Sequence, residues 1–140
     1  MMSKQYQIAV IDGQGGGIGK SVVAQLKKEM PELSVLALGT NSTATAQMIK
    51  AGADAGATGE NAIALNVHKV DIVIGVVAIL AADSMLGELT PAMAKEIGAC
   101  QALKLLIPLN RCGIQVAGTQ KLQLPQAVQN IVETVREYYR

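Results

Sequence analysis

The sequence predicts an α/β fold, a three-layer α/β/α sandwich built on a Rossmann-like and mostly parallel sheet. Segments typical of β-strands alternate with segments of helical periodicity along the chain. The strand segments are mostly apolar, as expected for parallel strands that helices cover on both faces. A run of glycines follows the first strand segment and leads directly into a helical pattern, which is typical of the first turn in such sheets.

Residues 6–38 predict a strand, a helix and a second strand. The first strand, residues 6–11 (YQIAVI), is short and rich in β-forming residues. From Gly19 the apolar residues recur at helical spacing until Pro31 ends the helix. The second strand is residues 34–38 (SVLAL), and the crossover between the two strands is expected to be right-handed.

The middle of the chain continues the alternation. A helix over residues 44–51 follows several residues suited to cap it, and Gly52 stops it. Residues 52–59 (GADAGATG) predict a loop with a very short strand inside it, and a helix over residues 60–67 follows. Residues 71–77 (DIVIGVV) are nearly all β-branched, which predicts a strand buried on both faces.

The C-terminal part of the chain predicts two helices and two strands. Residues 78–89 form a loop or a short helical turn, and residues 90–98 a helix that starts with threonine and proline. Residues 104–107 and 114–117 predict an antiparallel hairpin at the edge of the sheet, where a proline is tolerated. An amphipathic helix over residues 125–139 closes the chain.

Length and composition limit the classes of function. The chain has 140 residues, which we interpret as a single domain over residues 1–140. Its 12 Lys and Arg nearly balance its 11 Asp and Glu, and Phe and Trp are absent, so we expect no nucleic-acid partner. The N-terminus lacks the apolar core of a signal peptide, and the longest apolar run is about half of what a bilayer crossing needs. We therefore expect a cytoplasmic protein without a membrane partner.

The cysteines and the histidine do not predict a metal site. Cys100 and Cys112 lack CxxC spacing, and His68 is the single histidine. A structural zinc site takes four ligands, so the sequence predicts no bound metal and reduced thiols.

The glycine-rich stretch DGQGGGIGKS, residues 12–21, is the main candidate site. Five of the seven residues from Gly13 to Gly19 are glycine. Their backbone N–H groups can approach a ligand closely beside the positive end of a helix, an arrangement that favours phosphate. The stretch therefore predicts a phosphate-bearing ligand, and a nucleotide in particular.

Three known loop templates fit this stretch, each with one flaw. The dinucleotide fingerprint GxGxxG requires a glycine where Ile18 stands. The P-loop template GxxxxGK[ST] ends correctly at Lys20 and Ser21, but Gln14 replaces its first glycine. The third fit, GxxxGIG beginning at Gly13, is similar to the cofactor loop of short-chain dehydrogenases, with aspartate in place of the preceding threonine.

The surrounding sequence favours NAD(P) as the cofactor and leaves ATP with Mg²⁺ as the alternative. A P-loop NTPase needs an acid at the end of a second strand, whereas Asp71 begins its strand. An NAD-binding unit needs an acid where Thr40 and Asn41 stand, and these residues either hold a phosphate or only cap the next helix. Gly75 lies where such folds bring the backbone close to a nucleotide, and no Tyr-xxx-Lys catalytic pair identifies a reaction. The predicted cofactor-binding residues are Gly13, Gln14, Gly15, Gly16, Gly17, Ile18, Gly19, Lys20, Ser21, Thr40, Asn41 and Gly75.

Further polar residues follow other strands, where ligands of open α/β sheets bind. Arg111 could clamp a phosphate or a carboxylate, and Asp83 with Glu88 could form a carboxylate pair for acid–base chemistry. Cys112 beside this arginine could be an activated thiol. The alternative for each is an ordinary surface or structural role, which also applies to Lys20. The additional candidates at strand ends are Asp12, Asp83, Asn110 and Arg111.

Five segments of the chain resemble one bacterial family, the domain of unknown function 3842. The segments are IAVIDGQGGGIGKS, LGTNSTAT, AGADAGATGENAI, DSMLGELTP and IPLNRC. The resemblance runs from about Tyr6 to Gly118 and implies a stand-alone, soluble bacterial domain of Rossmann type without an assigned activity. It adds Glu60 and Asn61, at a helix start after a glycine-rich loop, to the candidate site.

Two other functions stay open beside NAD(P) binding. One is a P-loop-like switch that binds ATP or GTP. The other is a non-enzymatic, oligomeric or regulatory module in which the glycines only let the first helix pack closely on the sheet. The apolar residues 72–89 exceed what one small domain comfortably buries, and this favours a homo-oligomer.

Overall fold

A five-stranded sheet forms the centre of the protein, in a computed structural model that describes residues 4–110 and 112–140. The strand order is β3-β2-β1-β4-β5, and each neighbouring pair is parallel. The order reverses between β1 and β4, as in Rossmann-type sheets. The predicted α/β class is therefore confirmed. The strands are β1 (Ile8–Asp12), β2 (Val35–Gly39), β3 (Ala55–Thr58), β4 (Ile72–Val76) and β5 (Leu103–Ile107).

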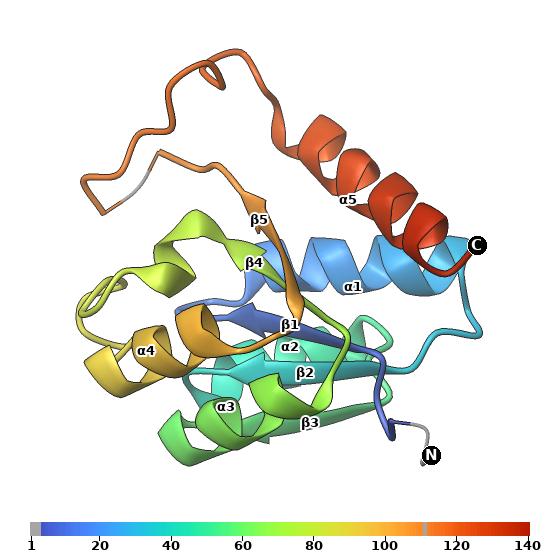
Figure 1. Ribbon diagram of the computed structural model, residues 1–140, viewed down its shortest axis with the longest axis horizontal. Helices are drawn as coiled ribbons and strands as arrows, with labels where there is room; N and C mark the ends of the chain where they lie inside the picture. The colour runs from blue at the N-terminus through green and yellow to red at the C-terminus, as the bar shows by residue number, and fades with distance from the viewer. Residues whose placement is uncertain (1–3, 111) are drawn as a thin grey trace.

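Helices flank this sheet (Figure 1). Helix α1 packs against both α2 and α5, whereas α3 packs against α4. Right-handed crossovers put α1 and α2 on one face and α3 and α4 on the other, which produces three layers. The helices are α1 (Gly17–Glu29), α2 (Ser42–Lys50), α3 (Glu60–Asn66), α4 (Pro91–Ala99) and α5 (Leu124–Tyr138), with the short 3₁₀ helices η1 (Val67–Lys69) and η2 (Val77–Leu80).

Burial of the strands follows their place in the sheet. Every residue of β1, β2 and β4 is buried, which accounts for their uninterrupted apolar sequences. The two edge strands, β3 and β5, are largely half-buried or exposed. In the described ranges, none of the helices has both the length and the apolar character that a bilayer crossing requires.

The predicted antiparallel hairpin after β5 is wrong. β5 pairs in parallel with β4, and residues 114–117 form no strand. From Pro108 the chain instead arches away from the sheet and returns as α5 (Figure 1). Cys112 and Gly113 both adopt positive φ and turn the chain, while Ile114 packs its side chain against the core. The β-forming side chain of Ile114 is thus accommodated by packing against the core, without pairing to another strand.

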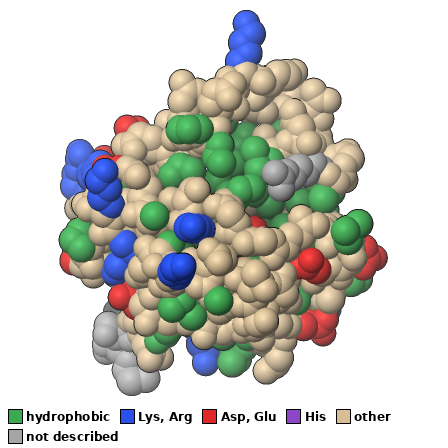
Figure 2. All heavy atoms as spheres, turned by 180° about the vertical axis from the view of Figure 1, so that it is seen from behind, with side chains coloured by type: hydrophobic (Ala, Val, Ile, Leu, Met, Phe, Trp, Pro, Cys, Tyr) green, Lys and Arg blue, Asp and Glu red, His purple; other side chains and the backbone are tan. Residues whose placement is uncertain are grey.

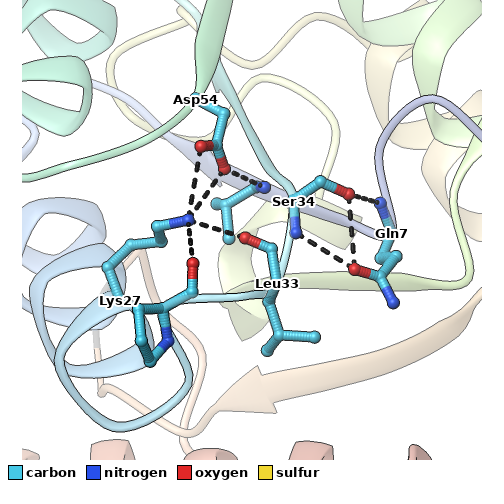
Figure 3. Close-up of polar contacts among 7 residues, drawn as sticks. Gln7, Lys27, Leu33, Ser34 and Asp54 are labelled. Carbon is cyan, nitrogen blue, oxygen red and sulfur yellow. Dashed lines mark hydrogen bonds and ion pairs between the residues drawn. The ribbon is translucent and has the colours of Figure 1, made fainter.

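Lys27 ties three segments together at the amino ends of the strands (Figure 3). Its ammonium donates to the carbonyl oxygens of Pro31 (3.1 Å) and Leu33 (2.7 Å) and pairs with Asp54 at 3.1 Å. Asp54 in turn accepts a 2.8 Å hydrogen bond from the N–H of Val35 at the start of β2. Only 17% of the Lys27 side chain is exposed, so these contacts are better shielded than those of an ordinary surface pair.

We expect Lys27→Met to lower the free energy of unfolding by about 2 kcal/mol at neutral pH, because two carbonyls and a carboxylate lose their donor. Burial by itself raises the pKa of Asp54, but the hydrogen bonds from Val35 and Lys27 outweigh it, so the pKa lies below 3.8. The ionised carboxylate therefore stabilises the fold above this pH and ceases to do so as the pH falls through the lowered pKa. The difference in unfolding free energy between wild type and variant should therefore be smaller at a pH well below 3.8 than at neutral pH.

Chemical denaturation at both pH values, followed by circular dichroism, measures this effect. Lys28→Met is the matched control, since Lys28 is exposed on α1. An equal loss of stability in the two variants would contradict the prediction.

Candidate functional site

The loop between β1 and α1 lies where the strand order of the sheet reverses. At this point the connections after β1 and β4 leave in opposite directions, which opens a crevice at the carboxyl ends of the strands. The loop turns through two residues with positive φ, Gln14 (49°) and Gly16 (74°). The N–H of Gly16 donates to Gly13 O at 3.0 Å, and α1 begins one residue later. The predicted glycine stretch thus forms a tight turn that ends in a helix N-terminus.

Asp12 holds this loop from the inside. The residue ends β1 and is 7% exposed. Its carboxylate accepts hydrogen bonds from the N–H of Gly13 at 2.8 Å and from the N–H of Gly19 at 2.6 Å. One of the first amides of α1 is therefore satisfied by the protein itself. Asp12 acts as a structural anchor of the loop, although it also borders the cavity described below.

Three of the five loop glycines are explained by packing. A Cβ added at Gly16 would lie 2.8 Å from Ala44 Cα, on the neighbouring helix α2. One added at Gly19 would lie 2.6 Å from Met48 Sδ, and one at Gly13 would approach two side chains to 2.7 Å or less. These three positions let α1 and its loop approach α2 and the sheet closely.

The other two loop glycines, Gly15 and Gly17, have no such explanation. A Cβ added at either position would meet no atom of residues 4–110 and 112–140 within 4 Å, and neither residue has a positive φ. Packing and backbone conformation therefore leave both positions open to other residues. The amides of Gly15, Gly17 and Ile18 also donate no hydrogen bond to any residue within 4–110 and 112–140. Three donors at or next to a helix N-terminus thus have no acceptor among the described residues, and backbone donors in this position are suited to bind an anion.

A cavity of about 280 Å³ adjoins these amides. One wall is the glycine loop, and the other consists mainly of apolar side chains that follow β4 and β5. Figure 2 shows a hollow in which hydrophobic side chains gather on this side of the molecule. The cavity can therefore hold an anionic group against the loop and an uncharged group against the apolar wall. Its lining residues are Asp12, Gly13, Gln14, Gly15, Gly16, Gly17, Ile18, Val76, Ala78, Met85, Leu109 and Cys112.

Glu88 connects the glycine loop to the end of β2. Its Oε1 atom accepts hydrogen bonds from the N–H of Gln14 at 2.8 Å, Thr40 Oγ1 at 2.8 Å and Asn41 Nδ2 at 2.7 Å. The Gln14 amide lowers the pKa of Glu88 most strongly, burial opposes it, and Asn41 and Thr40 lower it further, so that the pKa lies below 4.5. The carboxylate is therefore ionised at neutral pH.

Thr40 and Asn41 do reach the glycine loop, as their place after β2 predicts. Besides its bond to Glu88, Asn41 donates through Nδ2 to Gln14 O at 3.0 Å. Its Oδ1 accepts from the N–H of Ala44 at 2.9 Å and caps α2. The interpretation of Asn41 as a helix cap is thus confirmed, and the same side chain also fastens the loop.

The two residues of the P-loop template do not line the cavity. Lys20 is exposed and forms no ion pair or side-chain hydrogen bond with the described residues. Ser21 donates through Oγ to Gly17 O at 3.1 Å and lies beside residues of α5. Asp71 lies at the opposite end of the sheet from the loop, where Lys4 and Tyr139 contact it. Lys20, Ser21 and Asp71, the residues that the sequence offered for the P-loop template, are thus all outside the cavity lining.

Most of the remaining candidates lie away from the cavity. Gly75 is in the middle of the sheet, where a Cβ would lie 2.9 Å from Ile79 Cδ1, so packing explains it. Glu60 and Asn61 are exposed at the start of α3, after the edge strand β3.

The predicted carboxylate pair of Asp83 and Glu88 does not form a hydrogen-bonded unit in the described parts of the chain. Asp83 is an exposed turn residue with a φ of 66°, and Glu88 bonds instead to the loop and to β2. Asn110 is exposed between two cavity residues, and Cys112 lines the cavity. Arg111 lies outside the described residues. Within residues 4–110 and 112–140, no group of three or more His, Cys, Asp and Glu is placed to hold a metal ion.

Comparison with known proteins places the chain in a family. The model of the family described as Domain of unknown function (DUF3842) matches residues 7–140. The searches of curated proteins and of solved structures found no match. The match includes all five strands, the glycine loop and Glu88. It confirms the resemblance seen in the sequence, and the chain belongs to the family of domain of unknown function DUF3842.

Proposed function

We propose that this protein binds the phosphate group of a nucleotide, of the NAD(P) type, at the glycine loop. One observation carries the proposal: Gly15 and Gly17 need not be glycine for packing or for backbone conformation. Both line the cavity, and their amides point at no acceptor in the described part of the chain. A ligand that approaches the backbone closely supplies the missing reason for glycine at both positions.

The shape of the cavity supports a dinucleotide more than ATP with Mg²⁺. The apolar wall formed by Val76, Ala78, Met85 and Leu109 suits a planar ring. A dinucleotide carries a ring at each end of its phosphates, so that one ring can lie on this wall while the other lies on the opposite side of the loop, whereas ATP carries a single ring. The crevice at the reversal of strand order is also where Rossmann-type sheets bind such ligands. The lysine and serine of the P-loop template, Lys20 and Ser21, are not among the residues that line the cavity.

Replacing Gly15 or Gly17 by alanine should weaken nucleotide binding at least tenfold while stability changes by no more than about 1 kcal/mol. The added methyl group enters open space in the free protein but lies where the phosphate must approach the amides. Calorimetric titration with NAD, NADP, ATP, ADP and FAD measures the affinity, and thermal unfolding measures the stability.

Gly98→Ala is the matched control. Its Cβ would also meet no atom within 4 Å, and the residue lies on α4, so the substitution should leave binding unchanged. Failure of all five nucleotides to bind at millimolar concentration would overturn the proposed function. Equal affinities of wild type and both loop variants would show that nucleotides bind elsewhere.

A further inference from the structure

Glu88 presents one bonded and one unbonded oxygen beside the glycine loop. The three donors that converge on Oε1 come from the loop and from the two residues after β2. In the described ranges, Oε2 accepts no hydrogen bond. The side chain is half-buried, and the hydrogen bonds to Oε1 fix the orientation of the carboxylate beside Gln14, a residue that lines the cavity. This leaves one oxygen of an ionised carboxylate without a described hydrogen-bond donor next to the end of β2.

We propose that Glu88 selects nucleotides whose ribose carries a free 2′-hydroxyl, which donates to Oε2, and rejects those with a 2′-phosphate. This inference rests on the proposed function and deepens it to a choice between NAD and NADP. When the phosphates of a dinucleotide lie on a β1–α1 loop, the adenosine ribose lies beside the end of β2. That strand is followed by Thr40 and Asn41, neither of which is an acid. Glu88, from the connection between β4 and α4, brings the carboxylate to the same place.

The bonds around Glu88 favour hydroxyl recognition over phosphate recognition. The Thr40 hydroxyl and the Asn41 amide would suit a 2′-phosphate if they were available, but both already donate to Oε1. A 2′-phosphate in this position would approach an ionised carboxylate, and two like charges at hydrogen-bond distance repel each other. The pKa of Glu88 lies below its ordinary value, so this repulsion persists at neutral pH. A neutral hydroxyl, in contrast, gains a charge-assisted hydrogen bond.

The test compares the affinities of NAD and NADP for the wild type, for Glu88→Gln and for Glu133→Gln. We expect the wild type to bind NAD at least tenfold more tightly than NADP, and Glu88→Gln to bring the two affinities within about threefold of each other. Glu133 is exposed on α5, so the same substitution there should leave the wild-type ratio unchanged. ADP should likewise bind more tightly than 2′-deoxy-ADP to the wild type, and with equal affinity to Glu88→Gln.

The affinity ratio separates selectivity from a loss of loop structure. If Glu88 only positions the loop, Glu88→Gln weakens NAD and NADP by the same factor, and the inference is overturned. It is also overturned if the wild type binds NADP as tightly as NAD, although the proposed function then stands. If no nucleotide binds at all, the proposed function fails, and the selectivity of Glu88 fails with it.

Discussion

Asp12→Asn is expected to lower the free energy of unfolding by about 3 kcal/mol. The carboxylate accepts from the N–H groups of Gly13 and Gly19, and it is buried. An asparagine of the same shape offers one oxygen and one NH₂ group, so one of the two amides would face another donor. Urea denaturation followed by circular dichroism measures the loss, and the effect should extend to nucleotide binding because Asp12 shapes the loop.

Asp71→Asn is the matched control for this substitution. Asp71 sits at the opposite end of the sheet and accepts from Lys4 and Tyr139, of which Lys4 is about half exposed. Its replacement should cost about 1 kcal/mol, as is typical of partly exposed pairs. If Asp12→Asn lowers the free energy of unfolding no more than Asp71→Asn does, Asp12 does not anchor the loop.

Gly16→Ala should also destabilise the fold by about 3 kcal/mol, through two separate effects. Its φ of 74° is strained for any residue with a Cβ, and the added atom would lie 2.8 Å from Ala44 Cα and 3.1 Å from Ala44 O. Both contacts are with backbone atoms, which cannot move aside as a side chain can. Thermal unfolding should show a lower transition temperature than for the wild type.

Gly15→Ala is the natural comparison, because the two positions are adjacent in the loop. It adds the same methyl group where no atom lies within 4 Å and where φ is not positive. Similar stabilities for the two variants would contradict the division of the loop into packing glycines and ligand-facing glycines. A stability loss confined to Gly16, with a binding loss at Gly15, would support that division.

This division explains why no loop template fits the sequence fully. Templates locate glycines by their spacing and assign each position in advance to a turn, to the ligand or to helix packing. A Cβ added at Gly13, Gly16 or Gly19 would approach other described residues too closely. At Gly15 and Gly17 an added Cβ would have no described atom within 4 Å. The view that the glycines only allow close packing of the first helix therefore accounts for three of the five. The dehydrogenase-like spacing includes Gly13 and Gly19. At both positions close packing explains why the residue is glycine.

The secondary structure was largely predictable because its causes are local. The β-branched run at β4, the threonine–proline start of α4 and the amphipathic pattern of α5 lie within a few residues of the features they specify. The hairpin prediction failed for residues 114–117, whose composition suits a strand. The conformation of residues 114–117 depends on the turn at Cys112 and Gly113 and on the packing of Ile114 against the core. Neither can be recognised from the β-propensity of the four residues.

The candidate site was predictable only in outline. The glycine loop, Thr40 and Asn41 were found because they follow strands whose carboxyl ends meet at one edge of the sheet. The partner of Glu88 was missed: Gln14 precedes it by 74 positions, and no spacing rule links the two residues. The sequence suggested Asp83 as its partner because the two acids are near each other along the chain, whereas the turn between them separates their roles.

The sequence by itself determined the alternation of strands and helices, the glycine loop after β1 and the membership of the family. Side-chain periodicity, helix caps and glycine content act over a few residues and can be recognised without coordinates. Only the tertiary structure decided which loop amides have an acceptor among the described residues, because the acceptors come from Asp12 at the end of β1, from Gly13 in the loop itself and from Glu88 in the β4–α4 connection. Asp12 accepts from the amides of Gly13 and Gly19, and Glu88 accepts from that of Gln14. The amides of Gly15, Gly17 and Ile18 have no acceptor in the described part of the chain, and all three residues line the cavity. The loop that the sequence predicted as one phosphate cradle is, in the folded protein, a packed turn in which three amides donate to no described residue.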